Sequence, residues 1–316
     1  MKTIYLLGIL VMMQSCNLLN EKAEITPLQN PLTTPSSSKN STPPENTTPP
    51  KEEDSEIVGN TKYTYEERKD IAYGSDELQK YDLYLPKITE GGAQTKVPVI
   101  VLFHGGNWSE GDKSFILPMV EYLKQKNLRC AIVNANYRLT FKSGVTYREQ
   151  LDDIRAIINK LSGEAGSLNI DPKFFLMGIS AGGHLALLYS YTSNSNGAVK
   201  AVGGIVPPAD LTTPDIRQGR MDTDITKLVG KPFEGNLEEY KNASPYFQVK
   251  SNATPTIVFY GGKDTVVPMA QGTAFNNKLI DLKVPHEYKI YQDQGHEWSV
   301  LPETLDFTIS FIDKYM

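Results

Sequence analysis

A Gly-x-Ser-x-Gly pattern centred on Ser180 is the first feature of the sequence that could do chemistry. The apolar residues 174–177 before it predict a short buried strand, and the apolar run 185–188 after it predicts a helix. A serine between a strand and a helix is the arrangement of a nucleophile elbow, in which a strained turn projects the hydroxyl above the sheet. Glycine fits at Gly178 and Gly182 because a Cβ there would meet the neighbouring strand or helix. We therefore expect Ser180 to be a nucleophile; an idle serine in a tight turn is the alternative.

A serine hydroxyl needs a base to become a good nucleophile, and the chain has four histidines. His286 begins a predicted strand and is expected at the surface. His184 lies one helical turn after the serine, where it cannot easily face the hydroxyl, and is expected to be structural. His104 ends the third predicted strand. His296 follows the last predicted strand in a loop that can fold back over the elbow, so we expect it to be the base; a surface-loop histidine is the alternative.

The base in turn needs a carboxylate that holds its tautomer and stabilises the imidazolium. Asp264 directly follows a predicted strand and precedes a predicted helix, whereas Asp210, which also follows a strand, is the rival. We favour Asp264. The resulting chain order of serine, aspartate and histidine is that of the α/β-hydrolases rather than of the chymotrypsin or subtilisin types.

The loop after the third predicted strand reads His-Gly-Gly-Asn-Trp and stands where an oxyanion hole is needed. Backbone amides of Gly106 and Asn107, together with the amide of Ala181 beside the nucleophile, are expected to hold a developing oxyanion. A simple Gly-Gly turn is the alternative. Trp108 and Trp298 are expected near the mouth as walls of a substrate pocket, with ordinary packing as the alternative.

Strands alternate with helices over most of the chain, which predicts an α/β fold with a mostly parallel, doubly wound sheet flanked by helices. A polar stretch, 211–248, follows the sixth predicted strand and is expected to form a small insertion or cap. Predicted strands cover 63–73, 80–85, 97–103, 128–134, 174–177, 199–206, 254–260 and 286–291, and predicted helices cover 116–125, 147–161, 185–188, 269–282 and 302–315.

The net charge of −5 over 316 residues argues against nucleic acid as a partner, because no basic stripe is present to release counterions. No apolar run reaches the roughly 18 residues that a membrane-spanning helix needs.

The N-terminus has a basic residue, a short apolar core and then Cys16 after a small residue, a pattern similar to a bacterial lipoprotein signal. We expect residues 1–16 to be that signal, with Cys16 lipidated; ordinary secretion with Cys16 incidental is the alternative. Residues 17–57 are rich in Pro, Ser and Thr and are expected to be a disordered tether. The catalytic domain is then expected over 58–316, held at a bacterial membrane by the lipid anchor only. Cys130 is expected to be a core residue.

The chain resembles α/β-hydrolase-fold serine esterases, and is similar to bacterial bifunctional acetylxylan and feruloyl esterases and to carboxylesterases of the hormone-sensitive-lipase kind. The resemblance covers about residues 60 to 316. It is carried by these motifs: 104–108 with 111–113, 136–139, Asp153, 178–184, 243–245 and 262–264. It implies a serine hydrolase that needs no cofactor and no metal, with acylation of Ser180 and water attack on the acyl-enzyme.

Two positions depart from the pattern of these esterases. Asn107 stands where they usually have glycine, so its side chain is expected to narrow the acyl site. Glu297 follows the predicted base where a small residue is usual, and either perturbs the base or faces solvent.

Three functions fit the sequence to different degrees. The leading hypothesis is hydrolysis of short acyl or feruloyl esters on a polysaccharide. The second is a peptidase of the prolyl-oligopeptidase type, although such enzymes usually carry a propeller before the hydrolase domain. The third is a non-catalytic binding protein on a hydrolase scaffold, which the intact Ser, Asp and His set disfavours. Fluorophosphonate labelling of Ser180 separates the third from the others, and a panel of ester and amide substrates separates the first two.

Overall fold

The computed structural model describes residues 61–91 and 95–316. The predicted signal (1–16), the lipidation site Cys16 and the predicted tether (17–57) lie outside the described residues and stay predictions. In the part that the structure describes, no helix is both long and apolar enough to cross a membrane.

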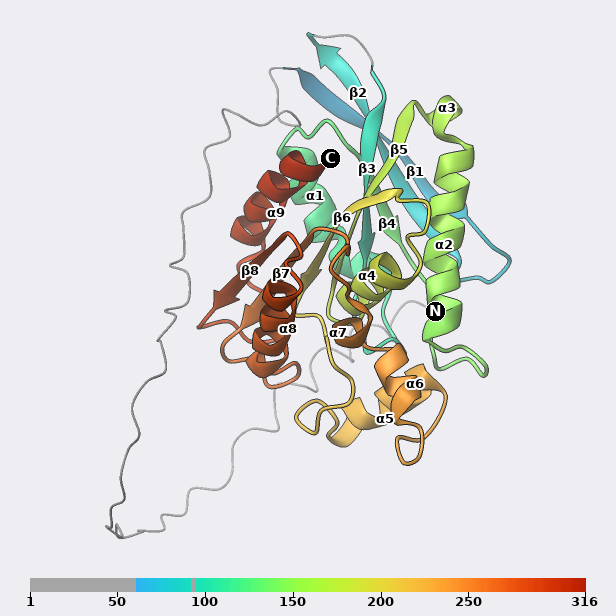
Figure 1. Cartoon of the computed structure of the whole chain (residues 1–316). Coiled ribbons are helices and arrows are strands. Elements are labelled where there is room, and N and C mark those ends of the chain that lie inside the picture. Colours follow the sequence, from blue (N-terminus) through green and yellow to red (C-terminus); the bar gives the residue numbers. More distant parts are fainter. Residues whose placement is uncertain (1–60, 92–94) are drawn as a thin grey trace, which may run out of the picture. The chain divides into compact units, whose positions relative to one another are not determined.

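A single eight-stranded sheet runs through the described chain in the order β1-β2-β4-β3-β5-β6-β7-β8 (Figure 1). Strands β1, β2 and β4 pair antiparallel, and every pair from β4 through β3 to β8 is parallel. The strands are β1 (Lys62–Ala72), β2 (Lys80–Glu90), β3 (Val97–Phe103), β4 (Ala131–Ala135), β5 (Ile170–Ile179), β6 (Val199–Ile205), β7 (Thr256–Gly261) and β8 (His286–Tyr291). This sheet confirms the predicted mostly parallel α/β fold.

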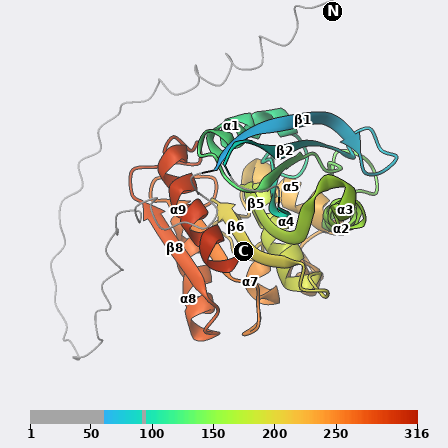
Figure 2. The same cartoon turned by 90° about the horizontal axis from the view of Figure 1, so that it is seen from above.

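Helices cover both faces of the sheet, as Figure 2 shows from above. The described helices are the 3-10 helix η3 (Lys113–Ile116) and the α-helices α1 (Leu117–Gln125), α2 (Tyr147–Gly163), α3 (Ala165–Leu168), α4 (Ala181–Thr192), α5 (Gly219–Val229), α6 (Leu237–Asn242), α7 (Pro245–Gln248), α8 (Met269–Asp281) and α9 (Leu301–Tyr315).

Alternation of side chains along the central strands divides the core into two layers. On β3, Val99, Val101 and Phe103 pack with residues of α2, α4 and α8, whereas Ile100 and Leu102 pack with residues of α1 and α9. Successive side chains of a strand point to opposite faces, so a strand buried on both faces must be apolar throughout. The near-continuous apolar run predicted as the third strand is therefore the centre of the fold.

The main differences from the predicted elements lie near chain turns. Strand β4 begins at Ala131 rather than at residue 128, because Asn127 takes a positive φ of 56° and the chain is still turning. The four-residue helix α3 was not predicted, since it is too short to show periodicity. Cys130 is fully buried, as expected, and burial raises the pKa of its thiol to about 12.

The predicted insertion after the sixth strand is present and contains α5, α6 and α7. Helix α5 buries Met221, Ile225 and Leu228, which are spaced by three or four residues and so form one face of the helix. The segment is attached to α2 by an ion pair between Arg148 and Glu239, 2.5 Å apart. The polar stretch therefore folds into short helices whose apolar faces join the core on the α2 and α4 side of the sheet.

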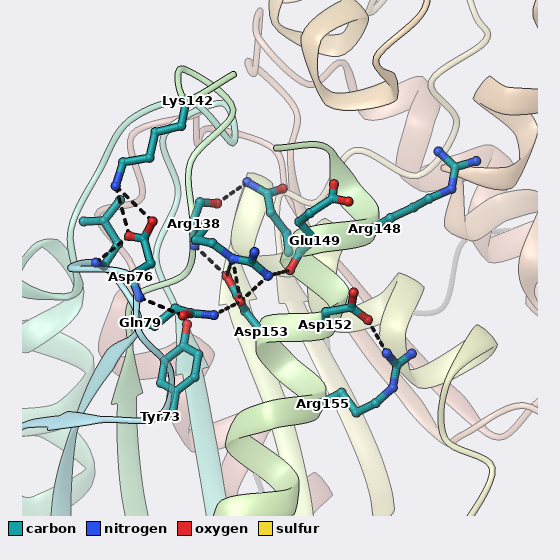
Figure 3. A network of polar contacts seen from close by, with 12 residues as sticks. Tyr73, Asp76, Gln79, Arg138, Lys142, Arg148, Glu149, Asp152, Asp153 and Arg155 are labelled. Carbon is teal, nitrogen blue, oxygen red and sulfur yellow. Dashed lines mark hydrogen bonds and ion pairs between the residues drawn. The ribbon is translucent and has the colours of Figure 1, made fainter. Parts of the chain in front are cut away.

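A polar network fastens the segment after β4 to helix α2 (Figure 3). The fully buried carboxylate of Asp153 accepts hydrogen bonds from the backbone amide of Arg138 at 2.7 Å and from its guanidinium at 2.7 to 2.9 Å. The Gln79 side-chain amide donates to the same carboxylate at 2.7 Å. A buried carboxylate is stable only when it is paired, so Asp153 depends on the donors from Arg138 and Gln79.

Replacing Asp153 by alanine is expected to destabilise the fold by roughly 3 kcal/mol, since it leaves the Arg138 and Gln79 donors without their acceptor. Asp152→Ala is the matched control. Asp152 lies one residue earlier on the same helix and pairs with Arg155 at the exposed surface, so its loss should change stability by less than about 1 kcal/mol. Urea denaturation of both variants measures the difference, and equal midpoints would contradict the role assigned to Asp153.

Candidate active site

Ser180 occupies the sharp turn between β5 and α4 in a strained backbone conformation, with φ 52° and ψ −118°. Positive φ is unusual for a residue with a side chain and persists only where the surroundings enforce it. The enforcement comes from close packing. A Cβ on Gly178 would lie 2.3 Å from the backbone of Gly182, and a Cβ on Gly182 would lie 2.3 Å from the carbonyl oxygen of Phe103 on β3. The two glycines let the turn press against the neighbouring strand.

The structure brings Ser180, His296 and Asp264 into hydrogen-bond contact. Nε2 of His296 lies 3.0 Å from Oγ of Ser180, and Nδ1 of His296 lies 2.8 Å from Oδ2 of Asp264. The second carboxylate oxygen of Asp264 accepts the backbone amides of Val266 and Val267, each at 2.8 Å. An acceptor on Nδ1 places the proton there and leaves Nε2 free to accept the serine proton.

The side chains of Asp264 and His296 differ in their exposure to solvent. The Asp264 side chain is fully buried, whereas the His296 side chain is 23% exposed and lies at the edge of a cavity. The carboxylate is thus withdrawn from solvent, and the imidazole ring predicted as the base lies at the opening.

The other acidic and histidine residues that the sequence offers for these roles lie outside this group of contacts. Asp210 accepts the amide and the hydroxyl of Thr212, at 2.8 and 2.6 Å, and makes no contact with a histidine in the described residues. His286 is half-buried and lies on β8, where it contacts the carbonyl of Val284. Glu297 is exposed and faces solvent.

The loop after β3 carries the amides of Gly106 and Asn107, which the sequence predicts as donors to an oxyanion. Gly106 and Asn107 line the same cavity as Ser180 and His296. Ala181 is the first residue of α4, so its amide has no acceptor within the helix. Among the residues that the structure describes, no backbone or side-chain acceptor is found for these three amides.

Two consecutive non-glycine residues of this loop have positive φ, Asn107 at 49° and Trp108 at 59°, and they follow Gly106 at 118°. Asparagine tolerates this region, but a tryptophan rarely adopts it. The side-chain amide of Asn107 is directed toward the buried carboxylate of Asp224 on α5, 3.4 Å away. The insertion therefore contacts this loop through Asn107. The sequence predicts only that the Asn107 side chain narrows the acyl site.

Trp108 is fully buried, which differs from the expected position in the pocket wall. Its indole N–H donates to Nδ1 of His184 at 3.0 Å, and Nε2 of His184 donates to the carbonyl of Ala243 at 2.7 Å. Burial lowers the pKa of His184 to about 4, so the ring is neutral and can accept at Nδ1. His184 is structural, as expected: it joins Trp108 to Ala243 in the insertion.

The segment after β4 holds the same loop from another side. Tyr137 stacks on His104 with ring centroids 4.4 Å apart and donates to the His104 carbonyl at 2.8 Å. The carbonyl of Trp108 accepts the amide of Thr140 at 2.9 Å and the side chain of Gln150 at 3.0 Å. Gln150 also donates to the Arg138 carbonyl, so the network of Figure 3 continues into this loop.

A cavity of about 310 Å³ opens beside the serine. Its apolar lining comes from Phe115, Ile116 and Ile179, and Glu110 adds a charged group that is bonded to Arg220 of α5 at 2.8 Å. Besides these, the lining includes Gly105, Gly106, Asn107, Ser180 and His296. Within the described residues, no cluster of His, Cys, Asp or Glu that could hold a metal ion is found.

Trp298 also lies apart from this lining. Its indole donates to Thr304 at 2.8 Å, and its ring packs edge-on against Tyr291. Both tryptophans expected in the pocket wall are therefore packing residues. Two apolar side chains of the lining, Phe115 and Ile116, were not predicted as site residues, because they lie on a turn before a helix where no motif marks them.

A model of the BD-FAE family matches residues 81–279. The chain is 27% identical over 232 residues to Esterase LipC of Mycobacterium tuberculosis, which is 68% of this chain and 55% of that protein. It spans about half the length of the curated relatives that it matches first.

Solved structures show the same fold. A bifunctional GH43-CE protein of Bacteroides eggerthii superposes with a TM-score of 0.67 at 24% identity, over 78% of this chain and 38% of that chain. A truncated carbohydrate esterase from gut microbiota superposes with a TM-score of 0.65 at 19% identity, over 82% of this chain and all of that chain.

Trp108→Phe is expected to slow the reaction of Ser180 with a fluorophosphonate by roughly 10- to 100-fold, because the loop that carries the amide donors loses its bond to His184 and shifts. Tyr65→Phe is the control. Tyr65 lies on β1, at the edge of the sheet and away from the serine, and its hydroxyl donates to the carbonyl of Leu128 at 2.8 Å. Labelling rates are compared at equal fractions of folded protein. A wild-type rate in Trp108→Phe would show that the indole bond does not position the loop.

Proposed function

Because this chain belongs to the BD-FAE family of α/β-hydrolase esterases, we propose that it hydrolyses carboxylic esters through an acyl-enzyme on Ser180. The observation that carries the proposal is the chain of contacts from Oγ of Ser180 to His296 at 3.0 Å and on to Asp264 at 2.8 Å. The names of its relatives, which include mycobacterial esterases, support the same activity.

Acylation begins when Nε2 of His296 accepts the proton of the Ser180 hydroxyl as Oγ attacks the ester carbonyl carbon. The carbonyl oxygen becomes an oxyanion, and the amides of Gly106, Asn107 and Ala181 donate to it. The tetrahedral species then collapses. The alcohol leaves with the proton from His296, and the acyl group stays on Oγ.

Deacylation repeats these steps with water. His296 accepts a proton from the water, whose oxygen attacks the acyl carbon, and the same amides hold the second oxyanion. Collapse releases the carboxylic acid and returns the proton to Oγ. Asp264 stays ionised throughout and keeps the proton of the neutral ring on Nδ1, which its two backbone donors favour by fixing the carboxylate in place.

For the substrate, we propose short acyl or feruloyl esters on a polysaccharide. A cavity of about 310 Å³ is near the lower limit for small-molecule sites and suits a short acyl group. The names of several similar proteins point to carbohydrate. They are a carbohydrate esterase from gut microbiota, a bifunctional GH43-CE protein and, at 28% identity over 162 residues, endo-1,4-beta-xylanase B of Butyrivibrio fibrisolvens.

Hydrolysis of p-nitrophenyl acetate, butyrate and octanoate is expected to fall with acyl length, because longer chains exceed the cavity. Ser180→Ala is expected to lose at least about 10³-fold in kcat/KM on all three, since the nucleophile is removed while the amide donors remain. Release of p-nitrophenol measures both. Equal rates for wild type and variant would refute the role of Ser180, and amide substrates would be tested next.

We also propose that Cys16 carries a lipid anchor that holds the enzyme at a bacterial envelope membrane, as the N-terminal pattern of residues supports. Expressed as the full chain, the wild type is then expected in the membrane fraction and Cys16→Ser in the soluble fraction. Detergent release and labelling with a radioactive fatty acid measure anchoring directly. The same distribution for both proteins would refute lipidation at Cys16.

A further inference from the structure

Phe115 is exposed beside the catalytic group. Its side chain is 68% exposed, the highest fraction among the large apolar side chains that the structure describes. It nevertheless lines the cavity that contains Ser180 and His296. A single exposed apolar side chain is common on protein surfaces, but this one also lines the cavity beside the serine, where a bound substrate would contact it.

The turn that carries Phe115 is fixed by polar contacts on both sides. Asp112 caps η3 by accepting the amide of Ser114 at 2.8 Å, and its other oxygen accepts the side chain of Asn136 at 2.7 Å. Asn136 also accepts the amide of Lys113, and the side chain of Asn134 donates to the Lys113 carbonyl at 2.8 Å. The backbone next to the phenyl ring is thus bonded to the end of strand β4 and to the residue directly after that strand.

A nearly buried ion pair adds a third attachment. Nζ of Lys113 lies 2.8 Å from the carboxylate of Asp82 on β2, and these side chains are only 13% and 6% exposed. The turn therefore has little conformational freedom left to lose when a ligand binds to Phe115, which makes it a preorganised surface.

The remainder of the rim is polar. Glu110 lines the same cavity and is held by Arg220, and both side chains are more than half exposed. A ligand at this rim therefore meets an apolar ring and charged hydrogen-bonding groups together. A pyranose has a matching division, with a face of C–H groups and hydroxyls around its edge.

We propose that Phe115 is a platform on which the sugar ring of the substrate's alcohol stacks, with its hydroxyls toward Glu110 and Arg220. This inference rests on the proposed function and names the part of the substrate that determines specificity. The buried Ile116 lines the interior beside the acyl group, whereas the exposed phenyl ring lies at the mouth, where a polysaccharide alcohol must stay in solvent.

The test compares two acetate esters that differ only in the alcohol, ethyl acetate and a monoacetylated methyl xylopyranoside, with acetate release as the readout. The quantity measured is the ratio of kcat/KM for the sugar ester to kcat/KM for ethyl acetate. Phe115→Ala is expected to lower this ratio about tenfold, which corresponds to about 1.4 kcal/mol of lost binding to the sugar. Phe115→Trp is expected to restore it, because a larger aromatic face also stacks.

Phe141→Ala is the matched control. Phe141 is 62% exposed but does not line the cavity, so its loss should leave the wild-type ratio. An unchanged ratio in Phe115→Ala, with a wild type active on both esters, would overturn the platform and leave the proposed function standing. A wild type that cleaves ethyl acetate but not the sugar ester would refute the carbohydrate substrate and the platform together.

Ethyl ferulate provides the last comparison. A loss in Phe115→Ala on ethyl ferulate but not on the sugar ester would assign the phenyl ring to the acyl group instead, and would also overturn the proposal.

Discussion

The close approach of helix α4 to strand β3 is the constraint on which the site depends. Gly182 lies so near the carbonyl oxygen of Phe103 that even a methyl group would collide with it. This contact brings the turn at Ser180 beside the loop that leaves β3, so the nucleophile and the amides of Gly106 and Asn107 border one cavity. A wider separation would leave a serine and an oxyanion loop that could not act on the same carbonyl carbon.

Parallel strands then bring the remaining groups to the same edge. The serine follows β5, Asp264 follows β7 and His296 follows β8, and the carboxyl ends of these strands lie together because the strands run in one direction. The aspartate is fixed by two backbone amides of its own loop. Within the described part of the chain, the histidine side chain is bonded to Ser180 and Asp264, and it remains partly exposed, which suits its proposed role in proton transfer.

Most of this arrangement can be predicted from the sequence, because the signals for it are local. The apolar run of β3 and the glycines around Ser180 are local signals, since burial on both faces and backbone contact each restrict residue type. The tryptophans show where such reasoning fails. An indole can line a cavity or bury itself against a neutral histidine, and nothing in the sequence around Trp108 shows that His184 will accept its N–H. The place of Phe115 in the cavity lining could not be predicted either. An apolar residue at the start of a helix is usually buried, and only the folded structure reveals that this one is exposed.

The two sides of the cavity are attached to different parts of the molecule. One side, the loop with Asn107 and Trp108, is bonded to the insertion through Asp224 and, by way of His184, through Ala243. The other side, the turn with Phe115, is bonded through Lys113 to Asp82 on β2 and to Asn134 on β4. Exchange of the insertion for that of a relative would therefore disturb the loop whose amides we propose as donors to the oxyanion. A change of alcohol preference is more easily obtained at the turn, whose tip can vary while its attachments remain.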